Sequence, residues 1–227
     1  MLDDKAMANK NASKKKSNRR SLLIGILAII IIVIGAYAVI RQPGIQTSNP
    51  SPTPTATPIS SPSSNVNGTK VLLHTTAGDI TVQLRTDKPI TTTNFINIVK
   101  KGWYDGSTFY RVVAGFMIQG GKINQTIPSI DDEIGTDNHN YNMTIAMAKT
   151  NQPNSATSEF FINVGNNNQI TYQGGIKFDD TYTTFGTVIS GQDIVEAIAN
   201  SAVTTNAYGE DSQPLNPVMI IKASIIS

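Results

Sequence analysis

An uncharged apolar run of 19 residues, Leu22 to Ile40, constrains this chain more than any other feature of its sequence. As a helix it would be about 28 Å long, which matches the hydrocarbon thickness of a bilayer. The run is apolar on all sides, so a core helix with one buried face does not account for it. We therefore expect residues 21–40 to form one membrane-spanning helix. A cleavable signal sequence, suggested by the small residues Ala36 and Ala38, remains the alternative.

The charges beside this run predict its orientation. Seven Lys and Arg residues precede it within residues 1–20, and Arg41 alone follows it directly. Positively charged flanks tend to stay in the cytoplasm, so residues 1–20 are predicted to form a cytoplasmic tail. The predicted location is the cell membrane, with a single pass and everything after the helix on the far side.

Residues 41–69 have the composition of a disordered linker. They hold six of the eleven prolines and eleven Ser or Thr residues, with few large apolar side chains. Such a segment cannot bury a core. Its reach would lie between roughly 30 Å as a coil and roughly 90 Å as an extended polyproline II chain. The sequence therefore predicts a domain that stands away from the membrane.

From Lys70 to Ser227 the composition is that of one globular domain. This part carries ten basic and fourteen acidic residues, a net charge of −4, so the chain's overall charge of +2 comes from its tail. Binding to nucleic acid is therefore not expected, because it needs a basic face on the folded domain. The chain has no cysteine and two histidines, which excludes disulfides and thiolate ligands and argues against a metal site.

Hydrophobic periodicity predicts eight strands and two helices in this domain. Alternation with a period of two predicts a hairpin of residues 71–75 and 79–84, and strands at residues 108–113, 116–119, 143–148, 159–164, 183–189 and 218–226. Apolar residues at helical spacing predict helices over residues 89–101 and 192–200. No strand–helix–strand alternation is present. We therefore expect a mainly β fold, a closed eight-stranded antiparallel barrel capped by two helices.

Three segments carry the functional signal. They are Phe109-Tyr-Arg-Val-Val-Ala-Gly-Phe-Met-Ile-Gln-Gly-Gly121, Met147-Ala-Lys-Thr-Asn-Gln-Pro-Asn-Ser-Ala-Thr-Ser-Glu-Phe-Phe-Ile-Asn-Val164 and Phe185-Gly-Thr-Val-Ile-Ser-Gly-Gln-Asp-Ile-Val-Glu-Ala-Ile198. In order and spacing they resemble the signature blocks of cyclophilin-type peptidyl-prolyl cis/trans isomerases, and the middle one is similar to the bacterial branch. The resemblance covers about residues 70–227. It implies a cofactor-independent enzyme that acts on X-Pro bonds, and the predicted topology adds that its proline-containing clients are exported or surface proteins.

This reaction needs an apolar pocket and a well-placed donor. The two isomers of an X-Pro bond differ little in energy, but a barrier of about 20 kcal/mol separates them because rotation breaks amide resonance. No nucleophile or metal is required. Strand alternation places Arg111 on one face with Phe109 and Val113, so a guanidinium lies among apolar neighbours. The alternative interpretation of the same pattern is an arginine without a catalytic role, whose charged end reaches solvent or forms a salt bridge.

The resemblance assigns roles residue by residue. The catalytic residues would be Arg111, which donates to the prolyl nitrogen or carbonyl, Gln119, which orients it, and Phe116. The substrate-binding residues would be Met117 and Phe161 in the proline pocket, Ile170 and Tyr182 at its rim, Ala148 and Lys149 through their backbone, and Glu159 and Phe109. Alternation alone sends Phe116 to the opposite face from Met117 and Gln119, so their joint assignment depends on the resemblance.

Two residues depart from the family pattern. Glu159 stands where the family usually has glutamine, and a carboxylate there would orient Arg111 or compete with substrate for it. In the second case Glu159→Gln raises catalytic efficiency. Gln169 stands where many members carry an aromatic residue, which predicts weak binding of cyclosporin. The alternative function is a noncatalytic module with the same fold that binds proline-containing peptides. A third hypothesis is a purely structural surface protein.

Overall fold

The computed structural model describes residues 68–172 and 174–226. The predicted cytoplasmic tail, the predicted membrane helix and nearly all of the predicted linker lie outside the described residues. Among the residues that are described, none of the helices has the length and apolar character needed to span a bilayer.

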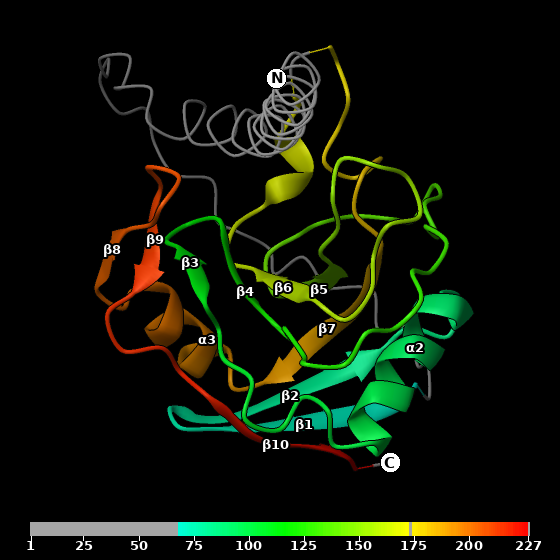
Figure 1. Ribbon diagram of the computed structural model, residues 1–227. Helices are drawn as coiled ribbons and strands as arrows, with labels where there is room; N and C mark the ends of the chain where they lie inside the picture. The colour runs from blue at the N-terminus through cyan, green and yellow to red at the C-terminus, as the bar shows by residue number, and fades with distance from the viewer. Residues whose placement is uncertain (1–67, 173, 227) are drawn as a thin grey trace, which may run out of the picture.

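Eight antiparallel strands form one curled sheet in the order β10-β1-β2-β7-β5-β6-β4-β3 (Figure 1). The strands are β1 (Lys70–Thr75), β2 (Gly78–Leu84), β3 (Arg111–Val113), β4 (Met117–Gly120), β5 (Thr144–Met147), β6 (Phe160–Asn163), β7 (Thr184–Ser190) and β10 (Ile220–Ile225). Each corresponds to one predicted strand, so the mainly β fold and the strand content are confirmed.

The predicted closure of the barrel is wrong, because no ladder joins the edge strands β3 and β10. Their chains meet just before each strand begins, at an isolated bridge between Thr108 and Met219. There the Phe109 N–H donates to the Val218 carbonyl at 2.9 Å, and the Ile220 N–H donates to the Ser107 carbonyl at 2.8 Å. Since this stretch leaves the regular ladder, β3 shrinks to three residues and the sheet remains an open half-barrel.

Two helices lie at opposite ends of the curled sheet, as predicted (Figure 1). The helix α2 (Pro89–Lys100) begins with a proline whose fixed φ suits the first turn, and it buries Phe95 and Ile98. The helix α3 (Gln192–Ala199) follows Gly191, which adopts a φ of 81° that favours glycine. Both helices pack their apolar faces into the hollow of the sheet.

A second, two-stranded sheet and a short helix have no counterpart in the prediction. The hairpin of β8 (Val203–Thr205) and β9 (Asp211–Pro214) lies beside β3 (Figure 1). The 3₁₀ helix η1 (Asn167–Gln169) follows β6. The strands β8 and β9 are three and four residues long, too short to show a clear alternation of apolar and polar side chains.

The half of the sheet formed by β3 to β6 is buried on both faces. Ile118, Phe160 and Ile162 point into the main core in the hollow of the sheet. Met117 and Phe161, one position along the same strands, belong to a separate apolar cluster on the outer face. The outer cluster is completed by residues from the turn before β4, from β3 and β5, and from the segment that follows η1.

The paired glycines that end the first signature segment allow chains to pack closely behind this outer face. A Cβ at Gly120 would lie 3.0 Å from the Thr108 carbonyl oxygen, and a Cβ at Gly121 would lie 2.6 Å from a ring carbon of Phe160. Gly121 also has a φ of 78°, which side chains disfavour. The spacing of this motif is therefore explained by packing.

Candidate active site

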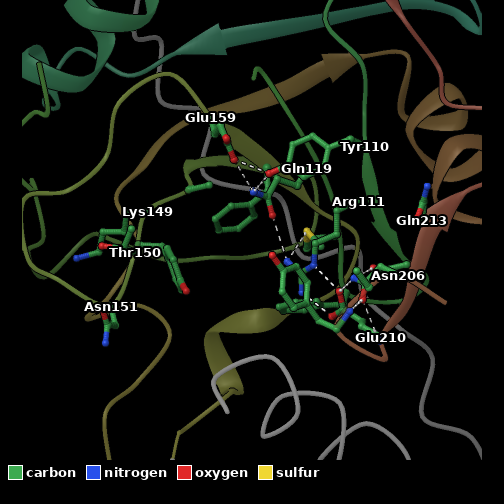
Figure 2. Close-up of a pocket in the computed structure, with 18 of the residues that line it drawn as sticks. Tyr110, Arg111, Gln119, Lys149, Thr150, Asn151, Glu159, Asn206, Glu210 and Gln213 are labelled. Carbon is green, nitrogen blue, oxygen red and sulfur yellow. Dashed lines mark hydrogen bonds and ion pairs between the residues drawn. The ribbon is translucent and has the colours of Figure 1, made fainter. Parts of the chain in front are cut away.

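A cavity of about 740 Å³ opens on the outer face of the sheet (Figure 2). Its floor is apolar and its rim is polar. Nine of the predicted site residues line it: Arg111, Phe116, Met117, Gln119, Ala148, Lys149, Glu159, Phe161 and Tyr182. The cavity thus collects residues from β3, β4, β6 and β9, from the segment that follows β5, and from loops far apart in the sequence.

The floor is a cluster of interlocked aromatic rings around Met117. Phe161 packs edge-on against Phe178 and Tyr182, at centroid distances of 5.8 and 5.3 Å. Phe116 meets Phe178 in the same way at 5.7 Å. Phe116, Met117 and Phe161 are 7%, 2% and 4% exposed, so neighbouring side chains hold the rings in place. Such a floor suits a small apolar ring.

Phe116 reaches this floor because it precedes β4 instead of lying in it. It ends a turn in which Gly115 has a φ of 71°, and regular alternation begins at Met117. The Asn167 side chain, which donates to the Phe116 carbonyl at 2.7 Å and to Asn163 Oδ1 at 2.6 Å, ties this turn to β6. Strand alternation had placed Phe116 on the opposite face from Met117, and this turn explains why both residues nevertheless line the same cavity.

Arg111 stands at the edge of the floor and is held on two sides (Figure 2). Its Nε and Nη2 atoms donate to the two carboxylate oxygens of Glu210, each at 2.7 Å. Its Nη1 atom donates to Gln119 Oε1 at 3.1 Å and lies 3.8 Å from Met117 Sδ. The Arg111 side chain is 20% exposed, so the guanidinium is neither in bulk solvent nor sealed away from the cavity.

Gln119 links Arg111 to a second carboxylate. Its Nε2 atom donates to Glu159 Oε2 at 3.0 Å and to the Tyr110 hydroxyl at 2.5 Å. The Tyr110 hydroxyl in turn donates to the same oxygen of Glu159. Glu159 therefore contacts Gln119 and not Arg111, so the predicted orienting role would act through Gln119, and the predicted competition has no direct contact behind it. The reason is that Gln119, which pairs with Arg111 across β3 and β4, lies between them.

Glu210 is the carboxylate that Arg111 contacts, and it did not figure in the prediction. Its side chain is 9% exposed. Burial by itself would raise the pKa of Glu210, but hydrogen bonds and the positive charge from Arg111 outweigh burial and lower that pKa. Glu210 is therefore ionised at neutral pH, and the pair is a bidentate, charge-assisted contact.

The opposite wall of the cavity is formed by Lys149, Thr150 and Asn151, which follow β5 (Figure 2). The Lys149 ammonium group donates to Asp132 at 2.6 Å and is thereby neutralised outside the cavity. The Ala148 N–H donates to the Glu159 carbonyl at 2.9 Å, which extends the pairing of β5 with β6. The predicted pairing of the Ala148 and Lys149 backbone with a substrate stays a prediction, and the structure shows that both residues line the cavity.

Two predicted substrate-binding residues lie outside the cavity. Phe109 is fully buried in the main core, where its ring packs against Phe160 at 6.2 Å. It precedes β3 and is not in the ladder, so alternation does not carry over from it to Arg111. Ile170 is 7% exposed and supports the floor from below without lining the cavity.

The position at which many family members carry an aromatic residue lies outside the cavity. Gln169 is exposed at the end of η1 and does not line the cavity, whereas Tyr172 and Phe178 do. Burial raises the pKa values of Tyr110, Tyr172 and Tyr182. These hydroxyls are therefore protonated at neutral pH and serve as hydrogen-bond donors. Within residues 68–172 and 174–226, no group of three or more His, Asp or Glu side chains could hold a metal ion.

Comparison with known proteins identifies relatives over the whole domain. A family model described as "Cyclophilin type peptidyl-prolyl cis-trans isomerase/CLD" matches residues 70–225. A peptidyl-prolyl cis-trans isomerase of Streptomyces antibioticus is 39% identical over 163 residues, which cover 69% of this chain and 98% of that protein. One of Acinetobacter baylyi is 41% identical over 167 residues, which cover 70% of this chain and 86% of that protein.

Solved structures share the fold. A cyclophilin-type peptidyl-prolyl cis-trans isomerase of Cryptosporidium parvum, determined in the presence of the dipeptide Ala-Pro, superposes with a TM-score of 0.57. It is 25% identical in sequence, and the match covers 70% of this chain and 99% of that one.

Proposed function

Since the chain belongs to the cyclophilin-type peptidyl-prolyl cis-trans isomerases and is an enzyme of that activity, we propose that its reaction takes place in the cavity beside Arg111. The observation that carries this assignment is the placement of the Arg111 guanidinium. It stands at the edge of an apolar aromatic floor, with 20% of the side chain exposed and its orientation held by Gln119 and Glu210.

The floor and the guanidinium perform different parts of the reaction. Phe116, Met117 and Phe161 hold the proline ring, because that ring is small and apolar. As the X-Pro bond twists, amide resonance is lost and the prolyl nitrogen becomes a hydrogen-bond acceptor. Arg111 donates to this nitrogen or to the adjacent carbonyl, so it binds the twisted bond better than either planar isomer. An interaction of this kind accelerates the reaction.

The remaining side chains position these groups and transfer no proton. Gln119 holds Nη1 of Arg111, and Tyr110 and Glu159 hold the amide of Gln119. The wall of residues 148–151 pairs with the backbone of a bound peptide. Rotation about an amide breaks no covalent bond, so this set of residues is sufficient without a cofactor.

An isomerisation assay on a peptide that contains an Ala-Pro bond tests the assignment. We expect Arg111→Ala to lower kcat/KM by about 100-fold or more, the loss typical of an electrostatic group in an active site. Arg85→Ala is the matched control, since Arg85 pairs with Asp87 and does not line the cavity. If Arg111→Ala is as fast as wild type, Arg111 does not have the proposed role, and if neither protein accelerates isomerisation, the domain would instead be a noncatalytic module that binds proline peptides.

We further propose that the enzyme is tethered to the cell membrane and acts on exported or surface proteins. The uncharged run Leu22–Ile40, the seven basic residues before it and the proline-rich residues 41–69 support this location. Slow prolyl steps in the folding of clients outside the cytoplasm would be its target.

Protease treatment of intact cells, with the outer membrane permeabilised where there is one, tests the location. Without protease, the full-length chain should sediment with the membrane fraction, and protease added to the cells should digest its domain. A variant that begins at residue 68 should be found in the soluble fraction and be protected from protease in the cytoplasm. Protection of the full-length chain would contradict the proposed topology.

A further inference from the structure

The partner that holds most of the Arg111 guanidinium comes from outside the three signature segments. Glu210 lies 99 residues along the chain from Arg111, in the turn between β8 and β9. The two side chains meet at the rim of the cavity (Figure 2). Nothing in the proposed mechanism of isomerisation requires a carboxylate at this place.

The turn between β8 and β9 is built to present Glu210. Asn206 organises it, because its Oδ1 atom accepts from the Tyr208 N–H at 2.8 Å and from the Glu210 N–H at 3.1 Å. The Asn206 N–H donates to the Glu210 carbonyl at 2.8 Å, and its side-chain amide donates to Ser212 Oγ at 3.0 Å. The backbone of Glu210 is thus fixed by its own hairpin, independently of Arg111.

The contact also selects which side of the guanidinium faces the cavity floor. Glu210 takes Nε and Nη2, while Nη1 points to Gln119 and to Met117 Sδ. An arginine carries five N–H donors in one plane, so a bidentate carboxylate fixes that plane. The donors that remain for a substrate are therefore held next to the apolar floor.

We propose that Glu210 is a positioning residue for the isomerisation, which holds the Arg111 guanidinium in the plane that serves the twisting X-Pro bond. This inference rests on the proposed role of Arg111. Glu210 acts through Arg111, because both of its carboxylate oxygens accept from the guanidinium. A free arginine at the rim would occupy several rotamers, so the carboxylate reduces the entropy lost as the transition state forms.

A purely stabilising ion pair fits the arrangement less well. Partly buried pairs recover little of the cost of desolvating both charges, so they are weak sources of stability. The hairpin has its own hydrogen bonds, and β3 is already paired with β4. The pair is therefore not needed to fix the position of either element.

The test is Glu210→Gln, which keeps the size of the side chain and removes its charge. Exchange NMR on a saturating Ala-Pro peptide measures kcat, and titration with the same peptide measures binding. We expect kcat to fall about tenfold and the dissociation constant to change less than about twofold, because the freed rotamers of arginine matter in the transition state. Glu196→Gln, an exposed carboxylate on α3 away from the cavity, is the matched control.

A double-mutant cycle with Arg111→Ala distinguishes positioning from general damage. If Glu210 works through Arg111, Glu210→Gln has no further effect on the residual rate of Arg111→Ala. The same tenfold loss in both backgrounds, or an unchanged kcat in Glu210→Gln, would overturn the inference. A normal rate in Arg111→Ala alone would instead overturn the proposed function on which the inference rests.

A second readout guards against a variant that folds poorly. In the wild-type protein, the Arg111 Nε–H should give a sharp NMR signal protected from solvent exchange. Glu210→Asp keeps the charge but shortens the side chain, so it should retain part of both the signal and the rate. A broad, rapidly exchanging Arg111 signal in the wild type would contradict the inference whatever the variants do.

Discussion

The two faces of β6 use neighbouring phenylalanines for different purposes. Phe160 points inward and is fully buried, with ring centroids 5.6 Å from Phe95 and 5.5 Å from Tyr104. Phe161 points outward, is 4% exposed, and forms the floor of the cavity with Phe178. One pair of identical residues thus supplies the core on one side of the sheet and the binding surface on the other.

The faces also differ in what packs against them. The hollow of the sheet is filled by strands and helices with regular apolar periodicity. The outer face is covered by the segment after η1 and bordered by the β8–β9 hairpin, and it collects Arg111, Glu159 and Glu210. The inner face therefore contributes most of the core, and the outer face adds a smaller apolar cluster together with the charged residues of the cavity.

The largest effect expected from this contrast is on stability. Phe160→Ala should lower the free energy of unfolding by about 3–5 kcal/mol, because it leaves a cavity among rings that cannot collapse. Phe161→Ala should cost about 2 kcal/mol, closer to the transfer free energy of the side chain alone. Urea denaturation of both variants measures the difference.

Peptide binding should change in the opposite order. Phe161→Ala should weaken binding of an Ala-Pro peptide strongly, whereas any folded fraction of Phe160→Ala should bind normally. If Phe160→Ala and Phe161→Ala lost equal stability and Phe161→Ala bound the peptide normally, the two faces of β6 would not differ in the way described.

A smaller effect should appear on acidification and should belong to the outer face. The pKa of Glu210 is lowered in the folded state, so its stabilising contribution is present above the unfolded value, about 4.3, and is lost as pH falls through the folded pKa. As pH falls from neutrality to below about 4.3, the wild type should therefore lose more stability than Glu210→Gln, and urea denaturation at each pH measures the difference.

Asp87 offers a control for this pH dependence. A hydrogen bond from Arg85 lowers the pKa of Asp87 too, but the Asp87 side chain is 55% exposed and far from the cavity. Asp87→Asn should therefore change the acid sensitivity less than Glu210→Gln does, and a larger change would show that the pair at the rim is not the main acid-sensitive contact.

The smallest effect concerns Glu159. Glu159 contacts Gln119 and Tyr110, and Gln119 lies between Glu159 and Arg111, so the competition expected from the sequence has no direct contact behind it. Glu159→Gln should change kcat/KM by less than about threefold, since a glutamine amide can replace one of the two hydrogen bonds. A rise of tenfold in the same assay would restore the competition hypothesis.

Local patterns in the sequence predicted the inner face well. Alternation and helical spacing depend on nearest neighbours, so they located all eight strands of the main sheet and both helices. Closure of the barrel could not be decided in this way, because it depends on how residues 107–110 meet the chain before β10. The family resemblance predicted Arg111 and the residues of the floor as site residues. Among them is Phe116, which reaches the floor from a turn and not from a strand.

The contacts that were missed depend on segments far apart in the chain or on irregular backbone. Glu210 meets Arg111 across 99 residues, and no periodic pattern surrounds Glu210. Phe178 lies in a loop without regular structure. Tyr110 was next to Arg111 in the motif, but alternation placed it on the opposite face, and the irregular backbone before β3 brings its hydroxyl to Gln119.

The central claim is that the apolar floor binds the proline and Arg111 accelerates its rotation. Exchange NMR on a peptide that saturates Arg111→Ala tests it most directly, because it measures the isomerisation rate of bound peptide. The account predicts chemical-shift changes at Phe116 and Phe161 like those of the wild type, with a rate at least about 100-fold lower. A bound peptide that isomerises at the wild-type rate would contradict it.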